Sequence, residues 1–62
     1  MHHYSISIWT KDGFEENHDL TRGAAFEISM SKLYTNKGEL IKCVRVEIRH
    51  PEFGLVYSAT NP

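Results

Sequence analysis

The chain has few of the residues that hold small domains together covalently. It contains a single cysteine among 62 residues, Cys43, which excludes an internal disulfide and suits a reducing compartment. No apolar run approaches the roughly 20 residues that a membrane-spanning helix requires. The first residues also lack the basic and then apolar layout of a signal peptide. We therefore expect a soluble, cytoplasmic protein.

The sequence lacks the charge pattern of a polyanion-binding protein and the glycine pattern of a phosphate-binding loop. The net charge is −1 at pH 7, with both signs interspersed, which argues against a dedicated polyanion binder and against an acidic mimic of nucleic acid. The four glycines stand singly, so there is no glycine-rich phosphate loop. Without repeats or linkers, residues 1–62 are expected to form one small domain, whose marginal core would gain stability from a partner.

The clearest pattern is a β-hairpin between Leu40 and Thr60. Apolar and charged residues alternate from residue 44 to residue 49, as in a strand with one dry and one wet face. Pro51–Gly54 has the residue types of a turn. A four-residue turn predicts the pairs His50 with Leu55, Ile48 with Tyr57 and Val46 with Ala59, which gather most apolar side chains on one face.

The first half of the chain predicts one strand and one helix. Tyr4–Thr10 alternates as a strand, Lys11–Gly13 is a turn signal, and Phe14–His18 is expected to be a polar loop. Asp19–Asn36 is expected to contain a helix that begins after Asp19 or Thr21 and ends near Asn36 to Gly38. The alternation of residues 26–31 favours a strand instead, but that leaves a long structureless loop before it.

These elements predict an α+β domain of order β-α-β-β, a three-stranded sheet with one helix packed on one face. The alternative is a four-stranded all-β meander. Two strand orders are possible. The strand from Leu40 lies parallel beside the first strand, after a right-handed crossover, or the last strand lies between the other two, which makes every pairing antiparallel. The predicted core comprises Tyr4, Ile6, Ile8, Phe26, Met30, Leu33, Leu40, Val44, Val46, Ile48, Leu55, Tyr57 and Ala59.

Catalytic and metal chemistry find little support in the sequence. Cys43 and His50 lie about 23 Å apart along one strand, at about 3.3 Å per residue, and on opposite faces, so they form no nucleophile–base pair. We therefore expect no enzyme activity and no cofactor. A free amino terminus followed by His2 and His3 suits square-planar Cu(II) or Ni(II). Because chain termini usually fray, we expect no metal there.

A surface for protein partners is the better-supported expectation. The open sheet face should carry Trp9 together with Arg45, Glu47 and Arg49, and tryptophan and arginine are enriched at binding hot spots. We expect a small protein-binding module that also associates as a homodimer. Weak single-stranded nucleic-acid binding by the same face is the alternative. The size and layout also resemble many short proteins of bacteria and phages, which implies a surface-blocking inhibitor of a larger host protein.

Overall fold

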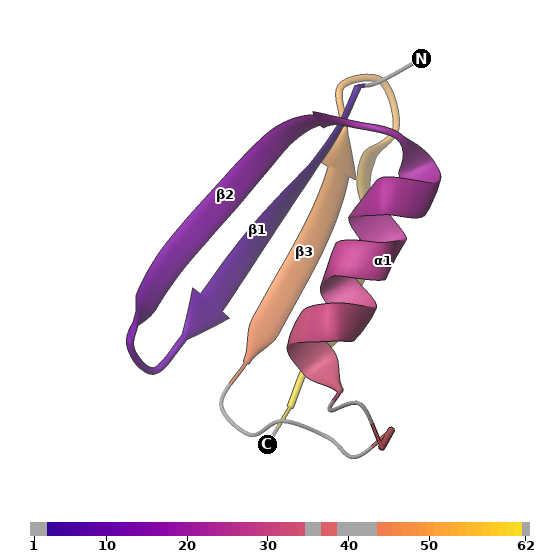
Figure 1. Ribbon diagram of the computed structural model, residues 1–62. Coiled ribbons are helices and arrows are strands. Elements are labelled where there is room, and N and C mark those ends of the chain that lie inside the picture. Colours follow the sequence, from indigo (N-terminus) through magenta and orange to yellow (C-terminus); the bar gives the residue numbers. More distant parts are fainter. Residues whose placement is uncertain (1–2, 35–36, 39–43, 62) are drawn as a thin grey trace.

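The chain folds into a four-stranded antiparallel sheet with one helix packed on one face (Figure 1). The computed structural model describes residues 3–34, 37–38 and 44–61. None of these residues belongs to a helix with the length and hydrophobicity to cross a membrane. The elements are β1 (Tyr4–Thr10), β2 (Gly13–Leu20), α1 (Arg22–Leu33), β3 (Arg45–His50) and β4 (Gly54–Thr60), and the order in the sheet is β2-β1-β3-β4.

Strand β2 is the main departure from the sequence prediction. Phe14–His18 is not a loop but the middle of an eight-residue strand that pairs antiparallel with β1. Lys11 and Asp12 form a two-residue turn, with Thr10 directly opposite Gly13. The prediction of three strands is therefore wrong. The all-β alternative has the right number of strands but lacks the helix.

The additional strand also changes how the others pair. Because β2 reverses the direction of the chain, α1 carries it back across β1, and β3 lies antiparallel on the far side of β1. The sequence-based expectation of a parallel neighbour is wrong, and so is the alternative with the last strand in the middle. Strand β4 lies at one edge of the sheet and β2 at the other.

The β3–β4 hairpin keeps the predicted register only along its inner part. Ile48 pairs with Tyr57 and Val46 with Ala59, as predicted. Near the turn, His50 pairs with Gly54 instead of Leu55, because β4 holds one extra residue opposite Arg49. This bulge turns Leu55 out of the predicted core and leaves it 48% exposed.

The helix lies inside the predicted range but buries a different stripe. Thr21 is the N-cap, and its Oγ1 accepts a hydrogen bond of 3.0 Å from the backbone N–H of Ala24. Ala25, Ser29 and Leu33 are buried against the sheet, whereas Met30, a predicted core residue, is 54% exposed. The small side chains of Ala25 and Ser29 leave room for the bulky aliphatic residues of the sheet. The hydroxyl of Ser29 donates to the Phe26 carbonyl at 3.0 Å, which satisfies it in the core.

Most of the predicted core is present between the helix and the two central strands. The buried apolar residues are Ile6, Ile8, Ala25, Leu33, Val44, Val46 and Ile48, with Tyr4, Phe26, Tyr57 and Ala59 packed around them. Leu40 and Cys43 lie outside the described residues. Asn61, directly after β4, is also buried: its side-chain Nδ2 donates to the Leu33 carbonyl at 2.9 Å and its backbone N–H to the Val44 carbonyl at 2.8 Å.

Candidate binding face

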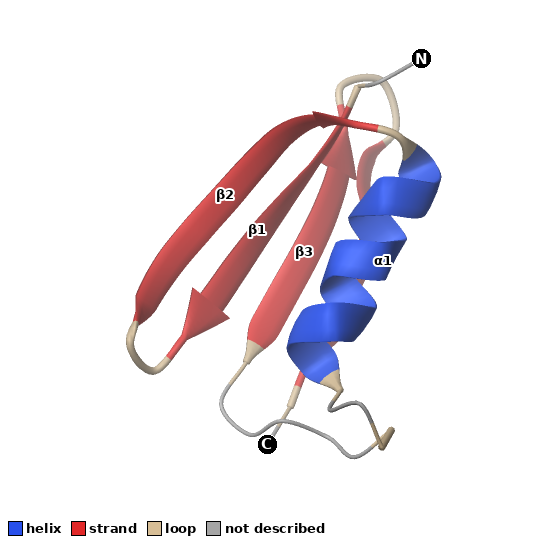
Figure 2. Cartoon of the chain, viewed as in Figure 1, coloured by secondary structure: helices blue, strands red, loops and turns tan. Residues whose placement is uncertain are grey.

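The helix covers one face of the sheet, and the opposite face carries no element of the described chain (Figure 2). We call this surface the open face. Residues that pair across neighbouring strands point to the same side of the sheet, so their side chains form rows across the open face. Its described residues are Ser5, Ser7, Trp9, Phe14, Glu16, His18, Arg45, Glu47, Arg49, Leu55, Ser58 and Thr60.

Three of these side chains form an aromatic corner at one end of the open face. Trp9 pairs with Phe14 on β2 and with Arg45 on β3, so the three lie in one row. The Trp9 and Phe14 rings lie 5.2 Å apart between centroids, and the Arg45 guanidinium carbon lies 5.3 Å from the Trp9 ring centroid. Trp9 is 36% exposed and Phe14 is 56% exposed. Trp9 therefore lies outside the core, on the open face, where its alternation with Ile6 and Ile8 predicts it.

A carboxylate held by two arginines occupies the middle of the open face. Glu47 Oε1 accepts from Arg49 at 2.8 Å, and Glu47 Oε2 accepts from Arg45 at 2.6 Å. The side chain of Glu47 is only 9% exposed, whereas those of the arginines are 54% and 52% exposed. The Arg49 and Arg45 hydrogen bonds hold the pKa of Glu47 below its ordinary value, against the opposing effect of burial. Glu47 is thus ionised at neutral pH and fixes both guanidinium groups.

A second polar network continues toward β2. The hydroxyl of Ser7 donates to Glu16 at 3.2 Å, and the other oxygen of Glu16 lies 2.9 Å from His18 Nε2. Glu16 and Glu47 lie on either side of Ser7 and balance the two arginines. The open face is therefore close to neutral, and hydrogen bonds link its charged side chains to one another and to Ser7 and His18.

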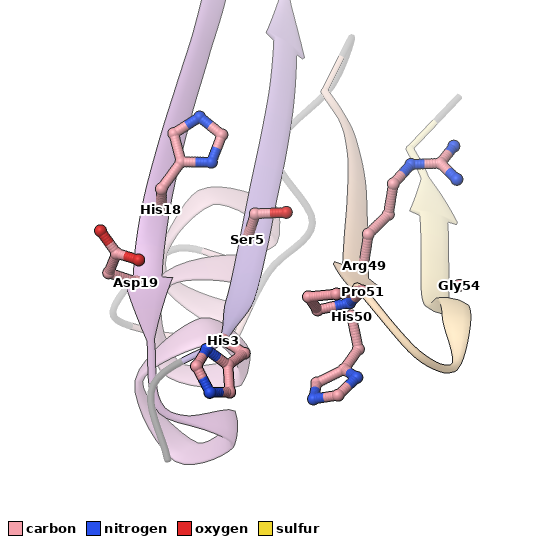
Figure 3. Close-up of a pocket in the computed structure, with 8 residues that line it drawn as sticks. All are labelled: His3, Ser5, His18, Asp19, Arg49, His50, Pro51 and Gly54. Atoms are coloured by element: carbon pink, nitrogen blue, oxygen red, sulfur yellow. The ribbon is translucent and has the colours of Figure 1, made fainter.

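A depression of about 410 Å³ lies at the other end of the open face (Figure 3). Ser5 of β1 lines it, in the row that also holds Arg49. In Figure 3, His3 and His50 lie close together at the end of the sheet, and their ring centroids are 6.3 Å apart. His50 also stacks on Phe53 at 4.5 Å, and its Nδ1 accepts from the backbone N–H of Glu52 at 3.1 Å. The lining residues are His3, Ser5, His18, Asp19, Arg49, His50, Pro51 and Gly54.

The depression has the residue types of a metal or catalytic site but not the geometry. Among residues 3–34, 37–38 and 44–61, no group of three or more histidine, cysteine or acidic side chains converges as metal ligands. Within the same part of the chain, no hydrogen bond joins Ser5 to a histidine, so no activated nucleophile is formed. His2 lies outside the described residues, so the amino-terminal copper or nickel arrangement is not described.

Sequence reasoning identified the β1 and β3 residues of this face but missed those on β2. Phe14 and Glu16 were expected in a loop, although they are the direct neighbours of Trp9 and Ser7. The dipeptide Asp12-Gly13 after a strand does signal a hairpin, but read as the two turn residues it would pair Lys11 with Phe14 and Trp9 with Glu16. The turn residues are instead Lys11 and Asp12, and pairing the strands from there places Phe14 beside Trp9.

Comparisons of the chain with protein-family models, with curated proteins and with solved structures gave no match. The function of the open face is therefore inferred from its own residues.

Proposed function

We propose that this protein is a small non-catalytic binding module that attaches to a protein partner through the aromatic corner and the adjoining arginines. The observation that carries this proposal is the row of Trp9, Phe14 and Arg45. It places two partly exposed aromatic rings and an arginine side by side on a rigid sheet. These residue types dominate the energetics of protein interfaces, particularly where they form one cluster.

The surrounding polar network supports binding with little loss of conformational freedom. Arg45 and Arg49 are already held by Glu47, so their remaining N–H groups are fixed before a partner arrives. A fixed guanidinium beside an aromatic ring fits a partner surface that offers an apolar group flanked by carboxylate or carbonyl oxygens. Occupation of a host protein's surface, as by an inhibitor encoded by a phage or mobile element, is one form that such binding takes.

The charges favour protein over nucleic acid as the partner. Glu47 pairs with both arginines of the open face, and Glu16 on β2 adds the second carboxylate that balances their charge. A phosphate backbone would have to compete with Glu47 for the guanidinium groups while approaching Glu16. Only one aromatic cluster is available for base stacking, whereas single-strand binders stack successive bases along a basic groove.

Affinity purification of the full chain with matched variants tests the proposal. We expect Trp9→Ala to lose a co-purifying protein that the wild-type chain retains, with an unchanged far-UV circular dichroism spectrum. Phe53→Ala is the matched control, because Phe53 is an aromatic residue 68% exposed and remote from the corner in the β3–β4 turn. It should retain the same protein.

Binding can also be followed without a label, because Trp9 is the only tryptophan in the chain. A purified partner that covers Trp9 should shift its fluorescence emission to shorter wavelength. Equal retention of the partner by Trp9→Ala and Phe53→Ala would refute the proposed face. Binding of a single-stranded oligonucleotide that weakens steeply with salt and is lost in Arg45→Ala would favour nucleic acid instead.

A further inference from the structure

The two edges of the sheet differ in how well they are protected from pairing with another strand. Edge strand β2 carries Glu15, Glu16 and Asp19, and it has one extra residue opposite the segment between Tyr4 and Ile6. Charged side chains and bulges are the usual means of blocking an edge. Edge strand β4, with the sequence GLVYSAT, has no charged residue and no proline. Its bulge lies toward the turn, where Val56 is the extra residue, and leaves the stretch from Tyr57 to Thr60 regular.

The unpaired backbone groups of β4 can be assigned from its partner strand. Asn61 donates its backbone N–H to Val44, so its backbone is turned toward β3. Backbone groups alternate in direction along a strand. Those of Ala59 and Tyr57 therefore also point to β3, and those of Ser58 and Thr60 point away from the sheet. Both of these residues are exposed.

We propose that two copies of this chain associate through their β4 strands, antiparallel, with Ser58 of one copy opposite Ser58 of the other. In this register, the outward backbone groups of Ser58 face each other, and Thr60 of one copy lies opposite Val56, the bulge residue, of the other. A two-fold axis through the Ser58 pair makes the contact self-complementary, as a closed dimer requires. The resulting cross-strand pairs are Ser58 with Ser58, Val56 with Thr60 and Tyr57 with Ala59, which bring no like charges together.

The same pairing would be unfavourable at the other edge. Two β2 strands joined antiparallel would bring the carboxylates of Glu15, Glu16 and Asp19 from both copies close together, and like charges across strands are destabilising. The β4 pairing instead covers Val56, which is 37% exposed in the single chain. A second copy is therefore the occupant whose chemistry fits this edge: an uncharged strand of β-favouring residues with the matching alternation.

The dimer would leave the open face available. Directly paired residues point to the same side of a sheet, so both helices lie on one face and both open faces join on the other. Trp9 and Phe14 lie on β1 and β2, away from the β4 edge. The dimer inference therefore does not depend on the proposed partner binding, and each can fail without the other.

Sedimentation of the full chain over a wide concentration range tests the pairing. The wild-type chain should pass from the mass of one copy to twice that mass, and Ser58→Ala should behave alike. Ser58→Lys should remain at the mass of one copy, because it sets two ammonium groups against each other at the axis. His18→Lys, which adds the same group to the open face at the β2 edge, should still dimerise. A wild-type chain that stays monomeric, or a Ser58→Lys variant that dimerises as well as wild type, would overturn the proposal.

Cysteine cross-linking tests the register itself in a Cys43→Ser background. Ser58→Cys should oxidise to a covalent dimer, because directly opposed residues of this kind lie about 5.5 Å apart between Cα atoms, which a disulfide spans. Thr60→Cys should cross-link poorly, because its two copies would be roughly 14 Å apart at about 3.4 Å per residue. Efficient cross-linking of Thr60→Cys with none of Ser58→Cys would show that the strands pair differently.

Discussion

Asn61 joins the end of the sheet to the end of the helix, and its removal should destabilise the whole domain. Its side-chain amide donates to the carbonyl of Leu33, the last residue of α1, at 2.9 Å. Both residues are buried, at 7% and 1% exposure. Asn61→Ala therefore leaves a helix-terminal carbonyl without this donor in a place that water reaches poorly.

The expected loss follows from the cost of a buried unsatisfied acceptor. Such a group costs about 1–3 kcal/mol, and we expect about 2 kcal/mol here because Asn61 also loses its packing. A domain of this length has a total stability of about 3–9 kcal/mol at roughly 0.05–0.15 kcal/mol per residue. The change therefore removes a large share of the total. It should lower the Tm by about 8–16 °C, since each kcal/mol shifts a domain of this size by about 4–8 °C.

Asn61→Asp separates the hydrogen bond from simple packing. An ionised carboxylate cannot donate to Leu33, and it faces the negative end of the helix dipole. Its pKa should therefore be raised in the folded state. By linkage, this variant should be less stable than Asn61→Ala at neutral pH and should recover as the pH falls through the raised pKa, where the protonated acid donates again.

The assay is urea unfolding followed by circular dichroism at pH 7 and at about pH 4, which is below a raised aspartate pKa. Asn17→Ala is the matched control, because Asn17 is a half-buried asparagine in β2 that makes no hydrogen bond through its side chain within the described residues. It should change stability by no more than about 0.5 kcal/mol. Equal stability of Asn61→Ala and wild type would refute the assigned role of Asn61. An Asn61→Asp variant with no pH-dependent recovery would refute the donor argument.

Five other substitutions have effects whose direction follows from the structure. Glu47→Gln should flatten the acid side of the stability profile in urea titrations. The lowered pKa of Glu47 stabilises the fold above the ordinary value of 4.5, and this contribution is lost as the pH falls through the folded-state pKa. Gly23→Ala should raise the Tm by an amount equivalent to about 0.5–1 kcal/mol, since a helical Cβ there meets open space. Gly54→Ala should lower the free energy of unfolding by about 1–2 kcal/mol, because the backbone φ of Gly54 is +74°. Met30→Lys should leave the circular dichroism spectrum unchanged, whereas Ala25→Lys should unfold the chain.

Sequence reasoning succeeded where one face of an element must be buried. The alternation of residues 44–49 with the apolar residues of β1 predicted both the strands and their faces, because a slip of one residue would reverse every side chain. Trp9, Arg45, Glu47 and Arg49 were placed correctly on the open face for the same reason. Whether these residues bind a partner stays a prediction.

The failures lie where burial does not constrain the pattern. Strand β2 buries no side chain fully, so its polar sequence reads as a loop. The bulge opposite Arg49 is a local backbone choice at the turn, and it decides the exposure of Leu55 without any change in composition. The rotation of α1 depends on how closely the small residues Ala25 and Ser29 let it approach the sheet, and the i, i+4 spacing of Phe26 and Met30 does not show this.

The polar composition that makes β2 resemble a loop also bears on the proposed association. An edge strand contributes to the sheet through backbone pairing, so its side chains are free to carry charge, and in β2 they do. Strand β4 has the same freedom, since Ser58 and Thr60 are equally exposed, yet it carries no charge. Two edges of one small sheet under the same physical constraints therefore differ in a property that packing does not require. This difference, rather than the presence of an open edge, is the reason to expect pairing at β4 and not at β2.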